Sequence, residues 1–468
     1  MLRIRPLRRL AVAALACAAL TSAAPKPEGS DPAPPASPAY EIADPAFLYR
    51  DNCRTTVGTF QPTPRSDGTP ASRVRYGTEN GASYHIEVPL DWNGEVVVWA
   101  HGYNGEGSVL CAGMPSLREH YIRRGYAWAA SSFRKNGYNV DTGVRDSRAV
   151  LAIFAREVGT PSRAYMTGDS MGGHITAVAI ETYRGVFDGA MPVCGVLGDA
   201  ELFDYFLDAN VTAAALAGAA KPAFPVDPSV YAGFVSRDVM PALGWVAPTG
   251  GLTPTSPAGR AWGAAVAQHS GGTRPGFASA FGFWNAVVDP GIKLPFLFSV
   301  YPGTTSGTIG SAGGNVTDNA DTVYQLDADP TLTVAEQKLN DAVLRVQASP
   351  ARKVIPAVVG DPRIPVMSLH TLGDLLVPFS MEQVYAQRVA GRGTPELLTQ
   401  RAIRGTLHCD FSPEELAMAF DDLVAWVETG QRPVGDDVLD ANVVADPRYG
   451  CRFTRGAHPY FTAETPCP

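Results

Sequence analysis

An alternation of short apolar runs with helix-like stretches is the feature that most constrains the fold of this chain. Residues 95–100 contain Val96-Val97-Val98-Trp99, a run of β-branched and aromatic side chains typical of a strand buried on both faces. Further strands are predicted at residues 84–88, 126–133, 163–167, 189–196, 364–369 and 400–404. Helical patterns at 146–158 and up to residue 184 separate several of them, and we found no hairpin turn signal. These observations predict an α/β fold, a mostly parallel central sheet with helices on both faces.

The alternation of predicted strands and helices stops in the middle of the chain. Residues 201–361 combine Ala-rich helical patches, Gly/Thr/Ser-rich loops and a group of aromatic side chains: Phe277, Phe281, Phe283, Trp284, Phe296, Phe298 and Tyr301. A length of 468 residues exceeds what one core usually fills. We therefore expect one core, formed by residues 46–200 and by 362–468 with a C-terminal tail, interrupted by a lid-like insertion at 201–361. The aromatic residues form either the core of that insertion or a substrate contact.

A helix start is predicted shortly after the last strand. Ser412 can cap the helix, Pro413 suits its first turn, and Glu415 completes a capping box. Residues up to 427 then place apolar side chains on one face, as a helix packed on a sheet requires.

The N-terminal residues are typical of an export signal. Residues 1–24 hold four arginines, then an apolar run, then small residues, and the run is too short to span a bilayer permanently. Residues 25–45 are rich in Pro and Ala and indicate a linker. We expect a secreted or periplasmic protein. A lipoprotein signal is the alternative, in which Cys17 would be lipidated and would anchor the chain to a membrane.

The cysteines outside this signal suggest disulfides. They are Cys53, Cys111, Cys194, Cys409, Cys451 and Cys467. Six cysteines in an exported chain allow fifteen connectivities. Cys451 with Cys467 is the favoured pair, because that bond would staple an otherwise irregular C-terminus.

Charge and motifs exclude several classes of function. The net charge of −8 gives no reason to expect a nucleic-acid partner. The sequence has no P-loop, no dinucleotide fingerprint and no zinc-ligand spacing, so we expect no cofactor and no metal. The composition, 45% hydrophobic, is enough to bury a core.

The strongest chemical motif is Gly168-Asp169-Ser170-Met171-Gly172-Gly173, which lies between a predicted strand and a predicted helix. A nucleophile on such a tight turn needs small neighbours two residues away on each side. Gly168 and Gly172 supply them. The helix that follows favours negative charge at its N-terminus. Ser170 is therefore the candidate nucleophile.

A second motif, His101-Gly102-Tyr103, directly follows the strand at 95–100. A His-Gly step there lets the backbone turn an amide toward a developing oxyanion. The amides of Tyr103 and Met171 are the predicted oxyanion hole. His101 itself is expected only to form hydrogen bonds in this turn.

A serine nucleophile needs a base, and the base needs a carboxylate. Asp374 and His408 each follow a predicted strand, which gives the chain order Ser…Asp…His. We predict His408 as base and Asp374 as its acid partner. Asp199, in the loop after the strand at 189–196, is the reserve acid.

With these motifs the chain resembles the α/β-hydrolase superfamily, over about residues 84–200 and 362–428. More narrowly, it is similar to secreted bacterial members described as esterase-like or prolyl-oligopeptidase-like. The resemblance implies a central sheet that carries the Ser-His-Asp triad, with the insertion in the place of a lid.

His408-Cys409 also resembles tannases and feruloyl esterases, in which a cysteine beside the catalytic histidine is bonded to one beside the serine. Here Asp169 precedes Ser170, so that pattern fails. Cys409 must pair elsewhere, with Cys194 as one choice, or stay free.

The leading functional hypothesis is an exported serine hydrolase acting on small or polymeric carboxylic esters through an acyl-enzyme. The alternatives are a serine peptidase or amidase, an acyltransferase and, last, a non-catalytic binding protein, because the fold alone does not decide between them. The sequence sets neither the oligomeric state nor the substrate.

Overall fold

The computed structural model describes residues 40–245, 254–304 and 314–468. The predicted signal, Cys17 and most of the predicted linker lie outside these residues. Among the described helices, none combines the length and the apolar character needed to cross a membrane.

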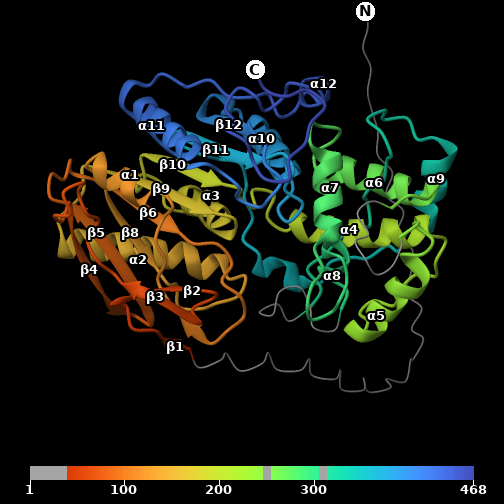
Figure 1. Cartoon of the computed structure of the whole chain (residues 1–468), viewed down its shortest axis with the longest axis horizontal. Coiled ribbons are helices and arrows are strands. Elements are labelled where there is room, and N and C mark those ends of the chain that lie inside the picture. The colour runs from red at the N-terminus through yellow and green to blue at the C-terminus, as the bar shows by residue number, and fades with distance from the viewer. Residues whose placement is uncertain (1–39, 246–253, 305–313) are drawn as a thin grey trace, which may run out of the picture. The chain divides into compact units, whose positions relative to one another are not determined.

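An eight-stranded sheet in the order β12-β11-β10-β9-β6-β8-β5-β4 forms the centre of the fold (Figure 1). Its strands are β4 (Ser72–Glu79), β5 (Ala82–Pro89), β6 (Glu95–Ala100), β8 (Ala127–Ser131), β9 (Arg163–Asp169), β10 (Gly189–Val193), β11 (Val366–Thr371) and β12 (Leu398–Ile403). In the part of the sheet that runs β12-β11-β10-β9-β6-β8, each strand is parallel to its neighbours. Strand β5 is antiparallel to both β4 and β8. The predicted fold class, a mostly parallel sheet, is confirmed.

Two small sheets accompany it. In one, β1 (Glu41–Ile42) pairs with β7 (Val109–Leu110). In the other, β2 (Phe47–Arg50) pairs with β3 (Thr55–Thr59). The Cys53–Cys111 disulfide connects the turn of this hairpin to the residue after β7.

Helices cover both faces of the central sheet. In β6, alternate side chains pack against the helices of opposite faces. Val96 and Val98 belong to the apolar cluster formed with α2 (Val140–Glu157), α3 (Met171–Thr182) and α10 (Ser380–Arg392). Val97 belongs to the opposite cluster, with α1 (Arg118–Arg123) and α11 (Pro413–Thr429). Alternate side chains of a strand point to opposite faces, so a continuous apolar run is what a doubly covered strand needs.

Between β10 and β11 the named elements of the described residues are all helical. They are α4 (Glu201–Leu216), α5 (Pro228–Phe234), η1 (Val235–Val239), α6 (Pro257–His269), α7 (Phe277–Ala286), α8 (Phe296–Ser299), α9 (Val334–Ala342) and η2 (Pro350–Val354), drawn from yellow-green to teal in Figure 1. Of the aromatic group, Phe281, Trp284, Phe298 and Tyr301 are buried. They therefore serve as packing in this segment. Its use as a lid remains a prediction.

A hairpin joins β4 and β5, contrary to the sequence-based expectation. Its turn is Asn80-Gly81, and both residues have positive φ, 51° and 82°. Asn-Gly favours the two-residue turns that join antiparallel strands, so the sequence did contain a hairpin signal. The expectation that no such turn is present was wrong.

One helix boundary and two short helical elements also differ from the prediction. Helix α2 begins at Val140, six residues before the predicted start, because buried Val140 and Val144 continue its apolar face. The elements η3 (Pro395–Leu397) and α12 (Ala441–Val444) were not predicted.

The capping box of α11 is confirmed. The Ser412 hydroxyl accepts the Glu415 amide at 3.2 Å, and the Glu415 carboxylate accepts the Ser412 amide at 2.7 Å. The predicted Cys451–Cys467 disulfide is also present in the tail.

The Asn80-Gly81 turn predicts opposite effects of the same substitution at two glycines. Gly81→Ala should lower the free energy of unfolding by about 1 kcal/mol, because alanine disfavours positive φ. Gly391→Ala should raise it by about 0.5 kcal/mol, because Gly391 lies in α10 with open space where a Cβ would stand. Urea unfolding of both variants measures the difference, and equal signs would contradict this account of the turn.

Candidate active site

Ser170 occupies a strained turn between β9 and α3. Its φ of 60° and ψ of −120° lie in a region that non-glycine residues rarely adopt. The neighbouring strand fixes the turn: the Ser170 amide donates to the carbonyl of Val193 at 3.0 Å, and the Val196 amide donates to the Ser170 carbonyl at 3.3 Å. The predicted strand–turn–helix geometry is therefore present around the candidate nucleophile.

The glycines of this turn have no room for a side chain. A Cβ at Gly168 would lie 2.3 Å from the carbonyl oxygen of Gly172. A Cβ at Gly172 would lie 2.1 Å from that of Ala100, the last residue of β6. Both obstacles are backbone atoms, which cannot rotate away. Any residue larger than glycine at position 168 or 172 would therefore clash with the backbone.

His101 stabilises the loop after β6 by hydrogen bonding and stacking. Its Nδ1 lies 2.7 Å from the Gly102 carbonyl oxygen, and its ring stacks on Phe133 at 4.1 Å between centroids. Burial lowers the pKa of His101, which favours the neutral imidazole. The structure places this histidine in a structural position, as the sequence suggested.

The two predicted oxyanion donors are the amides of Met171, which directly follows Ser170, and of Tyr103, in the loop after β6. Met171 is the first residue of α3, so its amide has no partner inside the helix. Among the described residues, neither this amide nor that of Tyr103 donates a hydrogen bond. The loop is close to Ser170, because a Cβ on Gly102 would lie 3.3 Å from the serine Cβ. Their role as an oxyanion hole remains a prediction.

Asp374 and His408 are brought together from two loops at the same edge of the sheet. Asp374 follows β11 and is fully buried, and His408 follows β12. The His408 Nδ1 donates to one carboxylate oxygen of Asp374 at 2.5 Å. The other oxygen accepts the amides of Leu376 and Val377 at 2.9 and 3.0 Å. These bonds fix both the carboxylate and the tautomer of the imidazole.

The reserve acid, Asp199, lies elsewhere. One of its carboxylate oxygens accepts Nη1 of Arg388 at 2.6 Å and the Val358 amide at 3.0 Å. Its carboxylate is therefore engaged in the attachment of α10, and the carboxylate bonded to His408 is that of Asp374.

A disulfide between Cys194 and Cys409 ties the histidine loop to the strand beside the nucleophile. Cys194 follows Val193, whose carbonyl holds the Ser170 amide, and Cys409 follows His408. A ring nitrogen of His408 and the two sulfur atoms lie within 4.8 Å of one another. Both sulfurs are bonded to each other and so offer no thiolate to a metal. The choice left open by the sequence is settled in favour of pairing with Cys194.

The far nitrogen of His408, Nε2, is buried and has no hydrogen-bond partner among the described residues, Ser170 included. Hydrogen bonds between a nucleophile and its base are often long until substrate binds. Nε2 of His408 is therefore free of other hydrogen bonds among the described residues and can accept a proton.

The mostly parallel eight-stranded sheet, with a serine on a strand-to-helix turn followed by Asp and then His at later strand ends, is characteristic of one fold. The chain has the α/β-hydrolase fold. The resemblance inferred from the sequence is thereby confirmed at the level of the fold.

Comparisons with known proteins identify a sequence relative of this chain at 24% identity. No family model matches the chain. The o-phthalyl amidase of Xanthobacter agilis is 24% identical over 424 residues, which cover 78% of this chain and 89% of that protein. This relative is, by its name, an amide-cleaving hydrolase.

Two solved structures are similar at lower identity. Feruloyl esterase B from Aspergillus oryzae has a TM-score of 0.44 at 14% identity, over 83% of this chain and 86% of its own. The acylaminoacyl peptidase of Pyrococcus horikoshii has a TM-score of 0.39 at 10% identity, over 75% of this chain and 42% of its own.

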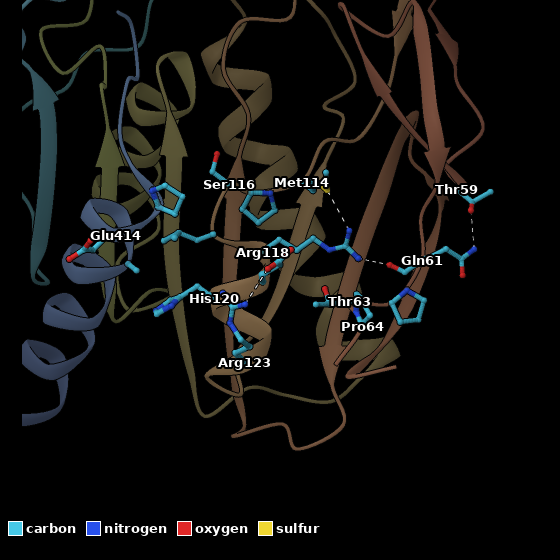
Figure 2. Close-up of a pocket in the computed structure, with 16 residues that line it drawn as sticks. Thr59, Gln61, Thr63, Pro64, Met114, Ser116, Arg118, His120, Arg123 and Glu414 are labelled. Atoms are coloured by element: carbon cyan, nitrogen blue, oxygen red, sulfur yellow. Dashed lines mark hydrogen bonds and ion pairs between the residues drawn. The ribbon is translucent and has the colours of Figure 1, made fainter. Parts of the chain in front are cut away.

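A groove of about 860 Å³ lies on the face of the sheet covered by α1 and α11. Figure 2 shows the Arg118 side chain within it, between Met114 and Gln61, with Glu414 on the opposite wall. Its residues 115–117 also line a small hollow that reaches Asp169. Neither hollow is lined by Ser170 or His408, so neither contains the candidate nucleophile or base.

Asp169 is a further ionisable group at this site, and its only signal in the sequence is that it stands where tannases and feruloyl esterases have a cysteine. One of its oxygens accepts Trp99 Nε1 at 3.1 Å. Burial raises the pKa of Asp169 to about 6, although the Trp99 bond and the positive charge of a protonated His408 act in the opposite direction.

The raised pKa of Asp169 predicts a pH-dependent loss of stability. The unfolded chain ionises this carboxyl near pH 3.8 and the folded chain only near pH 6, so ionisation between these values favours unfolding. Asp169→Asn should therefore gain stability over the wild type progressively from pH 4 to pH 6, by about 2 kcal/mol, and keep that gain above pH 6. Urea unfolding at several pH values measures it. A difference that stays constant from pH 4 to pH 8 would rule out this assignment.

Proposed function

We propose that the protein is an exported serine hydrolase that cleaves carboxylic esters, with Ser170 as nucleophile, His408 as base and Asp374 as its orienting acid. The observation that carries the proposal is the buried Asp374–His408 hydrogen bond, at the sheet edge where Ser170 occupies its strained turn. A hydrogen-bonded carboxylate and imidazole beside a serine are the parts that nucleophilic acyl transfer needs.

The residues support the following sequence of steps. His408 Nε2 takes the hydroxyl proton of Ser170 as Oγ attacks the ester carbonyl carbon. The amides of Tyr103 and Met171 bind the resulting oxyanion, and each such donor contributes about 3–4 kcal/mol. His408 then gives its proton to the alcohol oxygen as the C–O bond breaks. Water, deprotonated in turn by His408, attacks the acyl carbon. The bond from that carbon to Ser170 Oγ then breaks, Oγ takes the proton back from His408, and the acid is released.

Asp374 acts through His408. The carboxylate accepts Nδ1–H, so the neutral imidazole presents its unprotonated nitrogen, Nε2, to Ser170. Its second oxygen is held by two amides, which keeps the negative charge in place when the imidazole becomes positive.

Amide hydrolysis is the second candidate, and the relative named o-phthalyl amidase favours it. The same residues would act, but His408 would have to protonate the amide nitrogen before the C–N bond could break. A peptidase or an acyltransferase would differ only in the leaving group or in the acceptor of the acyl group.

Export is supported by the three disulfides, since such bonds persist in oxidising compartments. We propose a secreted or periplasmic location, with attachment through a lipid on Cys17 as the alternative.

Activity against p-nitrophenyl acyl esters tests the proposal. Ser170→Ala should lower kcat at least about 1000-fold and abolish labelling by a fluorophosphonate, because no other nucleophile occupies the elbow. Ser116→Ala is the matched control: this exposed serine lines the groove of Figure 2 and should keep wild-type turnover. If the wild type shows neither turnover nor labelling, a binding protein becomes the better interpretation.

Paired substrates distinguish the two hydrolytic candidates. An ester and an amide with the same acyl group should be compared by kcat/KM, and the ester should be cleaved faster. Faster cleavage of the amide would replace the ester assignment with that of an amidase.

A further inference from the structure

The indole of Trp284, in α7 of the inserted segment, joins the loops that carry the proposed acid and base. Its Nε1–H is shared between two backbone carbonyls, that of Gly373 at 2.9 Å and that of Thr406 at 3.1 Å. Gly373 directly precedes Asp374, and Thr406 lies two residues before His408. One donor from the insertion thus contacts both halves of the Asp374–His408 pair.

The indole of Trp284 is buried and packed between aromatic rings. Trp284 is 7% exposed, and its ring packs on Phe296 at 4.6 Å and on Phe283 at 5.6 Å between centroids. If the indole N–H were removed, the carbonyls of Gly373 and Thr406 would lose their shared donor. Because water is largely excluded there, it could not easily replace that donor.

A second side chain of the insertion reaches the same loop. The buried Arg274, just before α7, donates from Nε to the carbonyl of Leu372 at 2.6 Å. The acid loop therefore accepts hydrogen bonds from two residues of the insertion.

We propose that Trp284 is a positioning residue for the catalytic pair. By fixing the carbonyls of Gly373 and Thr406 on a single donor, it sets the separation of the two loops and so the alignment of Asp374 with His408. The inserted segment then belongs to the catalytic scaffold in addition to any role as a cover. This inference rests on the proposed function, because it assigns Trp284 a role in that same site.

Trp284→Phe tests the role, because phenylalanine keeps an aromatic ring and lacks the N–H donor. Trp262→Phe is the matched control. Trp262 is also a buried tryptophan of the insertion, but its Nε1 donates to the carbonyl of Ala209, away from both loops. Both variants and the wild type should be measured for kcat and KM on one ester, and for the low-field proton resonance of the His408–Asp374 hydrogen bond.

Trp284→Phe should lower kcat about tenfold, leave KM within twofold, and shift or broaden the low-field resonance, because small displacements of catalytic groups cost rate. Trp262→Phe should change neither kcat nor the resonance. Unchanged kcat and resonance in Trp284→Phe, or equal losses in both variants, would overturn the proposal.

The test remains decisive if Trp284→Phe does not fold or if the wild type shows no turnover. If Trp284→Phe does not fold, benzothienylalanine at position 284, which keeps the indole shape without the N–H, takes its place with the same expectations. If the wild type shows no turnover that depends on Ser170, the proposed function fails. The resonance still tests the inference in that case, because it needs no substrate.

Discussion

The close approach of three backbone segments around the nucleophile turn is the constraint on which the rest of the site depends. The α3 N-terminus packs so tightly between the ends of β6 and β10 that a side chain at Gly172 would meet the Ala100 carbonyl, and one at Gly173 would lie 2.5 Å from the Cα of Gly195. This packing holds Ser170 in its unfavourable backbone conformation. It also brings Gly102, the residue before Tyr103, close to the same serine.

Local chemistry explains what could be predicted. The run in β6, the glycines of the turn and the capping box of α11 each depend on residues close together in sequence, so a short motif carries the full signal. The pairing of Asp374 with His408 was predictable for a different reason: parallel strands place their carboxyl ends at one edge, so residues that follow two such strands meet there.

The remaining features depend on contacts that no local pattern encodes. Trp284 and Asp374 are ninety residues apart, and nothing in the aromatic group distinguished the side chain that bridges two loops from those that only fill the core. Asp169 gained its raised pKa from burial, which a sequence does not specify. The hairpin between β4 and β5 is the exception, because its Asn80-Gly81 turn is a local signal that the sequence itself contains.

The Cys194–Cys409 bond also has a topological consequence. It closes a loop that spans 215 positions and contains the entire insertion together with β11 and β12. In the chain-entropy view, a closure of that length raises the free energy of the unfolded ensemble by about 5 kcal/mol. The insertion lies within that ring, and it also holds the histidine loop from inside the ring, because Trp284 donates to the Thr406 carbonyl. The loop that carries His408 is thus fixed at two points, covalently to the residue after β10 and by a hydrogen bond to α7.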